Sequence, residues 1–307
     1  MITKAKNGKW GFNQSFTHKT EASARTAYAK VLEQERNDFD EFIVWKNTGF
    51  TKRGDGKVLR RYERRLVKHL RTLWAKQEQY IIENLDLFFV EENHMKNFVD
   101  PNINVVLSEM PEKENIAKAI VATMQVSMAR GAKSSIKQLD LGQFGISYNL
   151  KNKESISFLS KKLSHELSDY RGNINKTTTD RIGKIINTSV EKGMSAGETA
   201  ELIRQQGKAG VFSVARGEMI AITETGRAYG KGSRIPIDEF KLTNPTRPVL
   251  KLWQTAGDDR VRPSHRANAS QGWIPYEATH TGTDEKFAPS MQPRCRCAEK
   301  FNIPAPE

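Results

Sequence analysis

The sequence predicts a mainly α-helical protein with a small C-terminal α+β domain. Through the first two-thirds of the chain, apolar residues recur at three- and four-residue steps, as they do in helices that bury one face. After about residue 249, strand-like and loop-rich segments replace this pattern. The chain has 307 residues, which is long for one compact core. We therefore predict a helical N-terminal region at 1–110, a helical body at 111–235 and a loop-rich, few-stranded α+β domain at 236–307.

The N-terminal region is expected to contain a short extended piece, a helix from about Glu21, and a second helix after the turn-rich segment 47–57. One face of the second helix is apolar and consists of Leu59, Tyr62, Leu66, Leu70 and Leu73. This spacing indicates a helix packed by its leucines.

The segment 52–76, which contains this helix, supplies more than half of the chain's net charge. The formal net charge is +13, and residues 52–76 hold ten basic and only two acidic side chains. The basic residues around the helix are Arg60, Arg61, Arg64, Arg65, Lys68 and Arg71. A solvated polar face is one interpretation, and binding to DNA phosphates or to an acidic protein surface is the other. Arginine predominates here and Glu63 is the only counter-charge, and both features favour phosphate binding.

The helical body is expected to contain a long amphipathic helix at 112–139 and further helices at 153–171, 177–192, 195–206 and 212–234. The helix at 195–206 opens with Ser195 and Glu198, the spacing of a capping box. The proline-spaced segment 236–248 is predicted to be a connector.

The C-terminal domain is expected to begin with a strand at 249–256, followed by a polar turn at 257–265. The segment at 295–303 alternates like a closing strand and holds Cys295 and Cys297, which are the chain's only two cysteines. Two cysteines cannot form a disulfide framework, so a reducing cytoplasm is the expected compartment. No apolar run is long enough to span a membrane and the N-terminus does not resemble a secretory signal, so we expect a soluble protein with no membrane partner.

An ordered set of motifs supports a family resemblance. The motifs are "ITETGRAYGKG", "LWQTAGDDRVRPSH", "GW", "KF", a proline and "RCRC". Over about residues 180–300 this set resembles the C-terminal domain of the phage Mu F-like head-morphogenesis, or minor capsid, proteins. The length, the helical N-terminal two-thirds and the cysteine pair are similar to those of stand-alone minor head proteins of tailed phages of Gram-positive bacteria.

The resemblance implies a function in phage assembly without catalysis. It implies a virion protein of the phage head interior, present in the host cytoplasm during assembly. The implied partners are the portal protein during procapsid assembly, a capsid or scaffolding protein, and double-stranded DNA bound without sequence preference. Such a protein would aid genome packaging or ejection, and the basic helix is what a protein beside packaged DNA is expected to carry.

The resemblance also directs attention to a zinc motif that this chain holds only in part. The family's cysteine and histidine positions fall on Arg262, His265, Gln292, Cys295 and Cys297, so two ligand positions are lost. Bound zinc would use His265, Cys295 and Cys297 with His280 or Asp258 as a fourth ligand. The alternative, which we favour, is a metal-free structural clasp and no cofactor. The predicted clasp residues are Glu224, Trp253, Asp259, Arg260, His265, Cys295 and Cys297, with Glu224 paired to Arg260 or Arg262.

A different class of function is a metal-dependent hydrolase or nuclease. It would be centred on Asp258, Asp259, His265 and the two cysteines, which lie in one polar, loop-rich region. The family-like domain occupies all of 250–307, however, and leaves no room for a separate effector domain. A protein without enzymatic activity is therefore our expectation.

Overall fold

The computed structural model describes side chains in residues 55–85, 106–149, 151–168 and 173–305, and the backbone at 3–4, 10–13 and 16–18. The chain separates into two compact units, residues 1–58 and residues 59–307. In the first unit, β1 (Thr3–Lys4), β2 (Trp10–Asn13) and β3 (Phe16–His18) form an antiparallel sheet in the order β1-β2-β3. The helix expected from about Glu21 lies outside the described residues.

The remaining elements agree with the predicted mainly α fold with a small C-terminal α+β region. The α-helices are α2 (Asp55–Glu83), α4 (Lys113–Gln138), α5 (Lys153–Leu167), α6 (Ile174–Glu191), α7 (Ala196–Gln206), α8 (Val214–Thr243) and α9 (Pro263–Ser270). The short turns are η2 (Leu141–Phe144) and η3 (Gly207–Val211), and the strands are β4 (Leu250–Gln254), β5 (Ile274–Pro275) and β6 (Ala298–Asn302). The fold-class prediction is confirmed.

Side-chain caps determine where several helices begin. Asn152 accepts a hydrogen bond from the backbone N–H of Ser155 at the start of α5, and Asn173 does the same for Lys176 at the start of α6. Ser195 and Glu198 form the predicted capping box at the start of α7. Each cap satisfies N–H groups that the first helical turn would otherwise leave without a partner.

The helices of the larger unit share one hydrophobic core. Helices α2, α4, α6, α7 and α8 each contribute fully or nearly fully buried side chains, including Leu66, Leu70, Trp74, Ile116, Ile120, Met124, Ile182, Ile186, Ile203 and Ile220. The predicted apolar face of α2 is buried along its length, because Leu59, Tyr62, Leu66, Leu70 and Leu73 are each at most 6% exposed. The three- and four-residue spacing therefore identified the buried face correctly.

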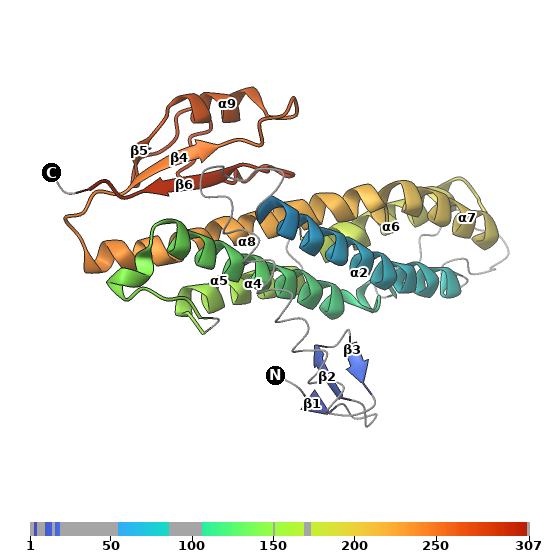
Figure 1. Ribbon diagram of the computed structural model, residues 1–307. Coiled ribbons are helices and arrows are strands. Elements are labelled where there is room, and N and C mark those ends of the chain that lie inside the picture. The colour runs from blue at the N-terminus through green and yellow to red at the C-terminus, as the bar shows by residue number, and fades with distance from the viewer. Residues whose placement is uncertain are drawn as a thin grey trace. The chain divides into compact units, whose positions relative to one another are not determined.

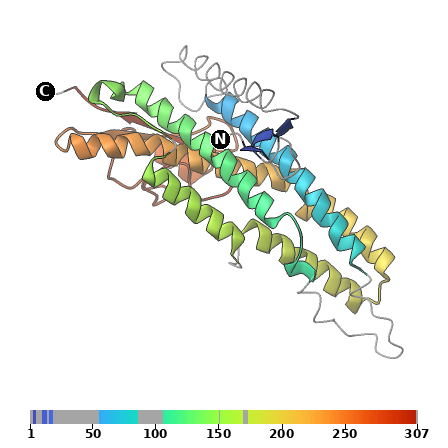
Figure 2. The same cartoon turned by 90° about the horizontal axis from the view of Figure 1, so that it is seen from below.

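Helices α4 and α8 pack backbone against backbone (Figures 1 and 2). A Cβ atom added to Gly232 of α8 would lie 2.0 Å from the carbonyl oxygen of Met128, and one added to Gly131 of α4 would lie 2.2 Å from that of Tyr229. Such distances are far inside van der Waals contact. Glycine is therefore required at both positions for this helix pair to approach so closely.

Helix α8 continues through Pro236, so the prediction of a connector from residue 236 is wrong. A proline inside a helix removes one hydrogen bond and crowds the preceding turn, at a cost of about 3 kcal/mol. Ile235, Ile237 and Phe240 are all buried at this end of the helix. Burying each such side chain contributes roughly 1.5–3 kcal/mol, which outweighs the cost of the proline.

The C-terminal sheet has the order β5-β4-β6, and all its strands are antiparallel. Figure 1 shows it between α9 and α8. Ile237 and Phe240 of α8 share a cluster with Val249, Tyr276 and Phe301. The sequence predicted β4 and β6, but it missed α9, which begins inside the expected polar turn with Pro263 in its first turn.

The predicted division into 1–110, 111–235 and 236–307 stays a prediction. Helix α8 crosses residue 235, and α2 shares its core with α4 to α8. None of the helices in the described ranges combines the length and apolar composition needed to cross a bilayer.

The glycine contact gives a direct test of the packing between α4 and α8. We expect Gly232→Ala to lower the free energy of unfolding by about 2 kcal/mol, because the new methyl group would meet the backbone of Met128. The matched control is Gly197→Ala in α7, where nothing lies within 4 Å of the added Cβ atom. We expect the control to leave the free energy of unfolding unchanged or to raise it by up to about 1 kcal/mol in urea unfolding, because alanine favours a helix over glycine. Equal effects of the two substitutions would contradict the close contact.

Candidate functional site

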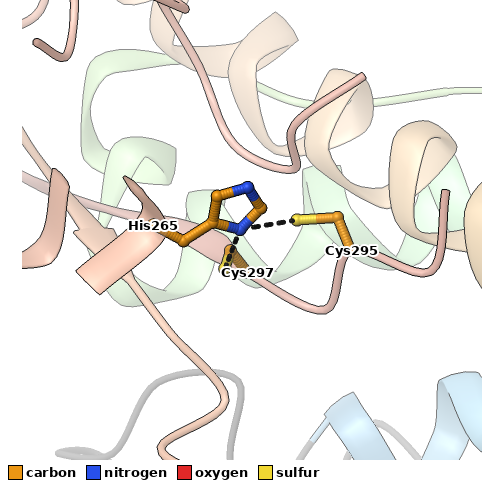
Figure 3. A group of neighbouring side chains, drawn as sticks. All are labelled: His265, Cys295 and Cys297. Carbon is orange, nitrogen blue, oxygen red and sulfur yellow. Dashed lines mark hydrogen bonds between the residues drawn. The ribbon is translucent and has the colours of Figure 1, made fainter. Parts of the chain in front are cut away.

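His265, Cys295 and Cys297 form a buried cluster in the C-terminal region (Figure 3). His265 lies on α9, and the cysteines lie on the segment that enters β6. The Nδ1 atom of His265 is 3.7 Å from the Sγ of Cys295 and 3.4 Å from the Sγ of Cys297. The sequence therefore selected three residues that the fold brings together from two separate segments.

The surroundings shift the pKa values of the two thiols in opposite directions. The pKa of Cys295 is lowered to about 7, chiefly by a hydrogen bond from Cys297 and also by nearby Arg262. The pKa of Cys297 is raised, because its proton is held between the two sulfurs and the site is buried. Burial and Arg262 also lower the pKa of His265. The lowered pKa of His265 favours a neutral imidazole, and of the two sulfurs Cys295 is the one that loses its proton first.

Trp253 of β4 packs against this cluster. It is fully buried, and its ring lies edge-on to His265 with centroids 5.5 Å apart and edge-on to His280 at 5.0 Å. The Nε2 of His280 lies 3.3 Å from a carboxylate oxygen of Glu299, and both side chains are buried. Trp253, Cys295 and Cys297 belong to one small hydrophobic cluster, so these residues join α9 to the sheet.

Neither predicted fourth ligand joins the three donors. Within the described part of the chain, the group whose ligand atoms lie within 4.8 Å of one another is His265, Cys295 and Cys297 alone. His280 faces Glu299, and Asp258 accepts two hydrogen bonds from Arg260, at 2.7 and 3.1 Å. Three donors fit a zinc ion with one open position but not a closed structural site, which has four protein ligands.

The other predicted clasp residues are placed differently from expectation. Asp259 and Arg260 are exposed and lie outside the buried cluster. Glu224 pairs with Lys162 of α5 at 3.0 Å and with Arg227 at 3.7 Å, so the predicted pairing with Arg260 or Arg262 is wrong. Residue spacing could not reveal this partner, because Lys162 lies 62 residues before Glu224 on another helix.

Glu63 joins α2 to the segment that carries the cysteines. Arg296 donates to both carboxylate oxygens of Glu63, at 3.2 and 3.1 Å, and the hydroxyl group of Thr225 in α8 donates a longer bond of 3.4 Å. Burial raises the pKa of Glu63, and Arg296 offsets part of this shift. Glu63 is thus an internal partner of Arg296. Its hydrogen-bonded cation is Arg296 and not one of the exposed arginines of α2.

A cavity of about 640 Å³ lies beside this ion pair. Its lining comes from α2, α8, the loop 256–262 that precedes α9, and the segment around the cysteines, and it includes His265, Cys295 and Cys297. The arginines that line it are Arg60, Arg64, Arg260, Arg262, Arg294 and Arg296. Arg294 and Arg296 were not predicted as site residues, although they alternate with the two cysteines in the sequence. This alternation of arginine with cysteine was the sequence signal that could have identified them as site residues.

The predicted basic face of α2 is therefore divided into two parts. Arg60 and Arg64 line the cavity, one helical turn apart. Arg65, Lys68 and Arg71 are exposed and are not part of that lining, and Arg61 is half-buried. We call Arg65, Lys68 and Arg71 the exposed basic stripe.

Comparison with known proteins confirms the family resemblance. Residues 184–299 match the family described as Phage Mu protein F like protein, a structural family of phage head morphogenesis. The matched segment begins within α6 and ends in β6, so it contains Trp253, His265, Cys295 and Cys297. It does not include α2. No curated protein and no solved structure matched the chain.

The metal-free clasp is testable by metal analysis. We expect purified protein to contain far less than one zinc per chain, and we expect its melting temperature to be unchanged by a strong chelator. The reason is that three donors converge here among the residues that the structure describes, and the neighbouring Arg262 opposes a further positive charge. The Cys295→Ser/Cys297→Ser variant is the control for weak surface binding. A one-to-one zinc content that this variant loses would contradict the clasp.

The Glu63–Arg296 pair should stabilise the protein in a pH-dependent way. At pH 7 we expect Arg296→Gln to lower the free energy of unfolding by about 2 kcal/mol, because it leaves a carboxylate that is 10% exposed without its cation. The folded-state pKa of Glu63 is raised, so protonation favours the fold and the loss should shrink as the pH falls toward 4.

The control for this prediction is Arg260→Gln. Arg260 is 84% exposed, so removing its pair with Asp258 should cost less than about 1 kcal/mol. Urea unfolding at several pH values measures both variants. A loss for Arg296→Gln that does not change with pH would show that Glu63 does not cause it.

Proposed function

We propose that the protein is a minor component of the phage head that associates with the portal during procapsid assembly and binds double-stranded DNA without sequence preference. The match of residues 184–299 to a head-morphogenesis family carries the first part of this proposal. That family indicates a virion protein and a structural one. Binding to the portal and binding to DNA are the two specific activities that we propose beyond this family assignment.

The exposed basic stripe supports the proposed DNA contact. Arg65, Lys68 and Arg71 project from a helix whose opposite face is buried, so the core holds their backbone in place. The carboxylate nearest to them in sequence, Glu63, is buried and hydrogen-bonded to Arg296. Lysines and arginines held in this way can contact phosphates without reading base sequence.

The protein partners that we propose are the portal and a capsid or scaffolding protein. The hydrolase alternative has weaker support, because Asp258 is engaged by Arg260 and Asp259 lies outside the His265–Cys295–Cys297 group. Incubation of DNA with the protein and Mg²⁺, Mn²⁺ or Zn²⁺ should accordingly leave the DNA intact.

DNA binding over a range of salt concentrations tests the proposal. For wild type we expect affinity for a DNA duplex to fall steeply between about 50 and 200 mM salt. The Arg65→Gln/Lys68→Gln/Arg71→Gln variant should bind more weakly, and its log–log salt slope should be shallower by up to about three. Fluorescence anisotropy with two unrelated duplex sequences measures both quantities.

The matched control removes three charges elsewhere. Arg181, Lys184 and Lys192 are exposed at α6 and its C-terminal cap, and changing all three to glutamine alters the net charge by the same amount. We expect the control to keep most of the wild-type affinity. If both variants lose affinity equally, net charge and not the stripe is responsible. If wild type does not bind DNA, the stripe serves a protein partner and the portal becomes the partner to test.

A further inference from the structure

We propose that the arginine-lined cavity between α2, α8 and the cysteine segment binds the phosphate group of a nucleotide, either a free nucleotide or the terminal nucleotide of a strand. This site is a cavity, whereas the exposed basic stripe is a row of side chains on the outer face of α2. The inference goes beyond the proposed function, because a ligand can occupy the cavity whether or not duplex DNA binds the stripe.

The cavity carries an excess of positive charge. Six arginines line it against three carboxylates, which belong to Glu63, Glu218 and Asp258. Two of these carboxylates are already engaged, Glu63 by Arg296 and Asp258 by Arg260. The lining therefore favours an anion.

Three of the arginines are fixed in position by neutral groups. The Nη2 of Arg262 donates to the carbonyl oxygen of Pro293 at 2.9 Å, and the Nη2 of Arg294 donates to that of Ala215 at 2.8 Å. The Nε of Arg64 donates to the carbonyl oxygen of Arg60 at 3.3 Å. A carbonyl oxygen orients a guanidinium without cancelling its charge. The remaining N–H groups are then preorganised for a phosphate, whose oxygens match the guanidinium fork.

The size of the cavity and its apolar lining favour a nucleotide over bare phosphate. A volume of about 640 Å³ falls within the usual range of small-molecule sites, and an intact duplex cannot enter it. Val67, Ile222 and Val261 also line the cavity and supply apolar surface against which a sugar or base can pack. The arginines would hold the phosphate, and the aliphatic side chains would hold the rest of the nucleotide.

The test compares ligands that differ only in their phosphate. A short oligothymidylate with a fluorophore at its 3′ end is prepared with either a 5′-phosphate or a 5′-hydroxyl group, and its binding is followed by anisotropy. Thymidine 5′-monophosphate and thymidine are compared by calorimetry. We expect the phosphorylated member of at least one pair to bind roughly tenfold more tightly. A preference in both pairs would indicate a strand end as well as a free nucleotide, and a preference in the second pair alone would indicate a free nucleotide.

Two variants locate the site, and a third serves as control. Arg262→Gln/Arg294→Gln should abolish the preference for phosphate. Arg64→Gln should reduce it severalfold, and it perturbs the fold little because the side chain is exposed and its bond to Arg60 lies within α2. The control Arg65→Gln/Arg71→Gln removes two exposed arginines of the same helix that lie outside the cavity, and it should keep the preference.

Three results would overturn the inference. The first is equal binding of the phosphorylated and unphosphorylated ligands. The second is a phosphate preference that survives in both cavity variants. The third is binding of a short polyglutamate peptide at least as tight as that of thymidine 5′-monophosphate, which would assign the cavity to an acidic protein segment. The stripe variant can lose duplex binding and still keep the phosphate preference, and that result would leave this inference intact. Failure of the nucleotide proposal and failure of the DNA proposal therefore give different results.

Discussion

The backbone contact between α4 and α8 is the constraint on which the larger unit depends. Gly131 and Gly232 allow the two helices to touch at their main chains, and this fixes α8 within the bundle. Helix α8 then supplies partners to several other parts of the unit. Thr225 donates to Glu63 of α2, Glu224 pairs with Lys162 of α5, and Arg234 donates to the carbonyl oxygen of Ala288. A shift of this one helix would displace α2, α5 and the C-terminal sheet together.

The sequence predicted those parts of the fold that depend on local pattern. The buried face of α2 and the capping box at Ser195 arise from residues three or four positions apart, so their periodicity was visible. Local rules failed where burial overrode them, as at Pro236, and where an element was too short to show a period, as for α9. The three-residue cluster was found because its residue types are rare in this chain and because the family resemblance singled them out.

The charges were harder to assign than the apolar residues. The sequence pattern indicated that Glu63 is the only counter-charge on a basic surface. In the structure it is buried against Arg296, which lies 233 residues later in the chain. The predicted partner of Glu224 was wrong because its cation, Lys162, also lies far away in the sequence. An ion pair between distant segments produces no periodic pattern in the sequence. Many cations are possible partners for each carboxylate, so the sequence does not indicate which one is used. The cavity arginines were missed as a group, since four of the six come from two loop-rich segments that only the fold brings beside α2.

The pair between Glu63 and Arg296 also orders events during synthesis. Chains fold from the N-terminus as they emerge, and contacts between distant residues wait until both have been made. Helix α2 is translated early, but its carboxylate has no cation from this pair until residue 296 has left the ribosome. The cavity beside the pair, which needs both α2 and residues 294–297, is likewise completed only then. A chain that stops short of residues 294–297 has the arginines of α2 without the other wall of this cavity, so the cavity forms late although half of its helical lining is made early.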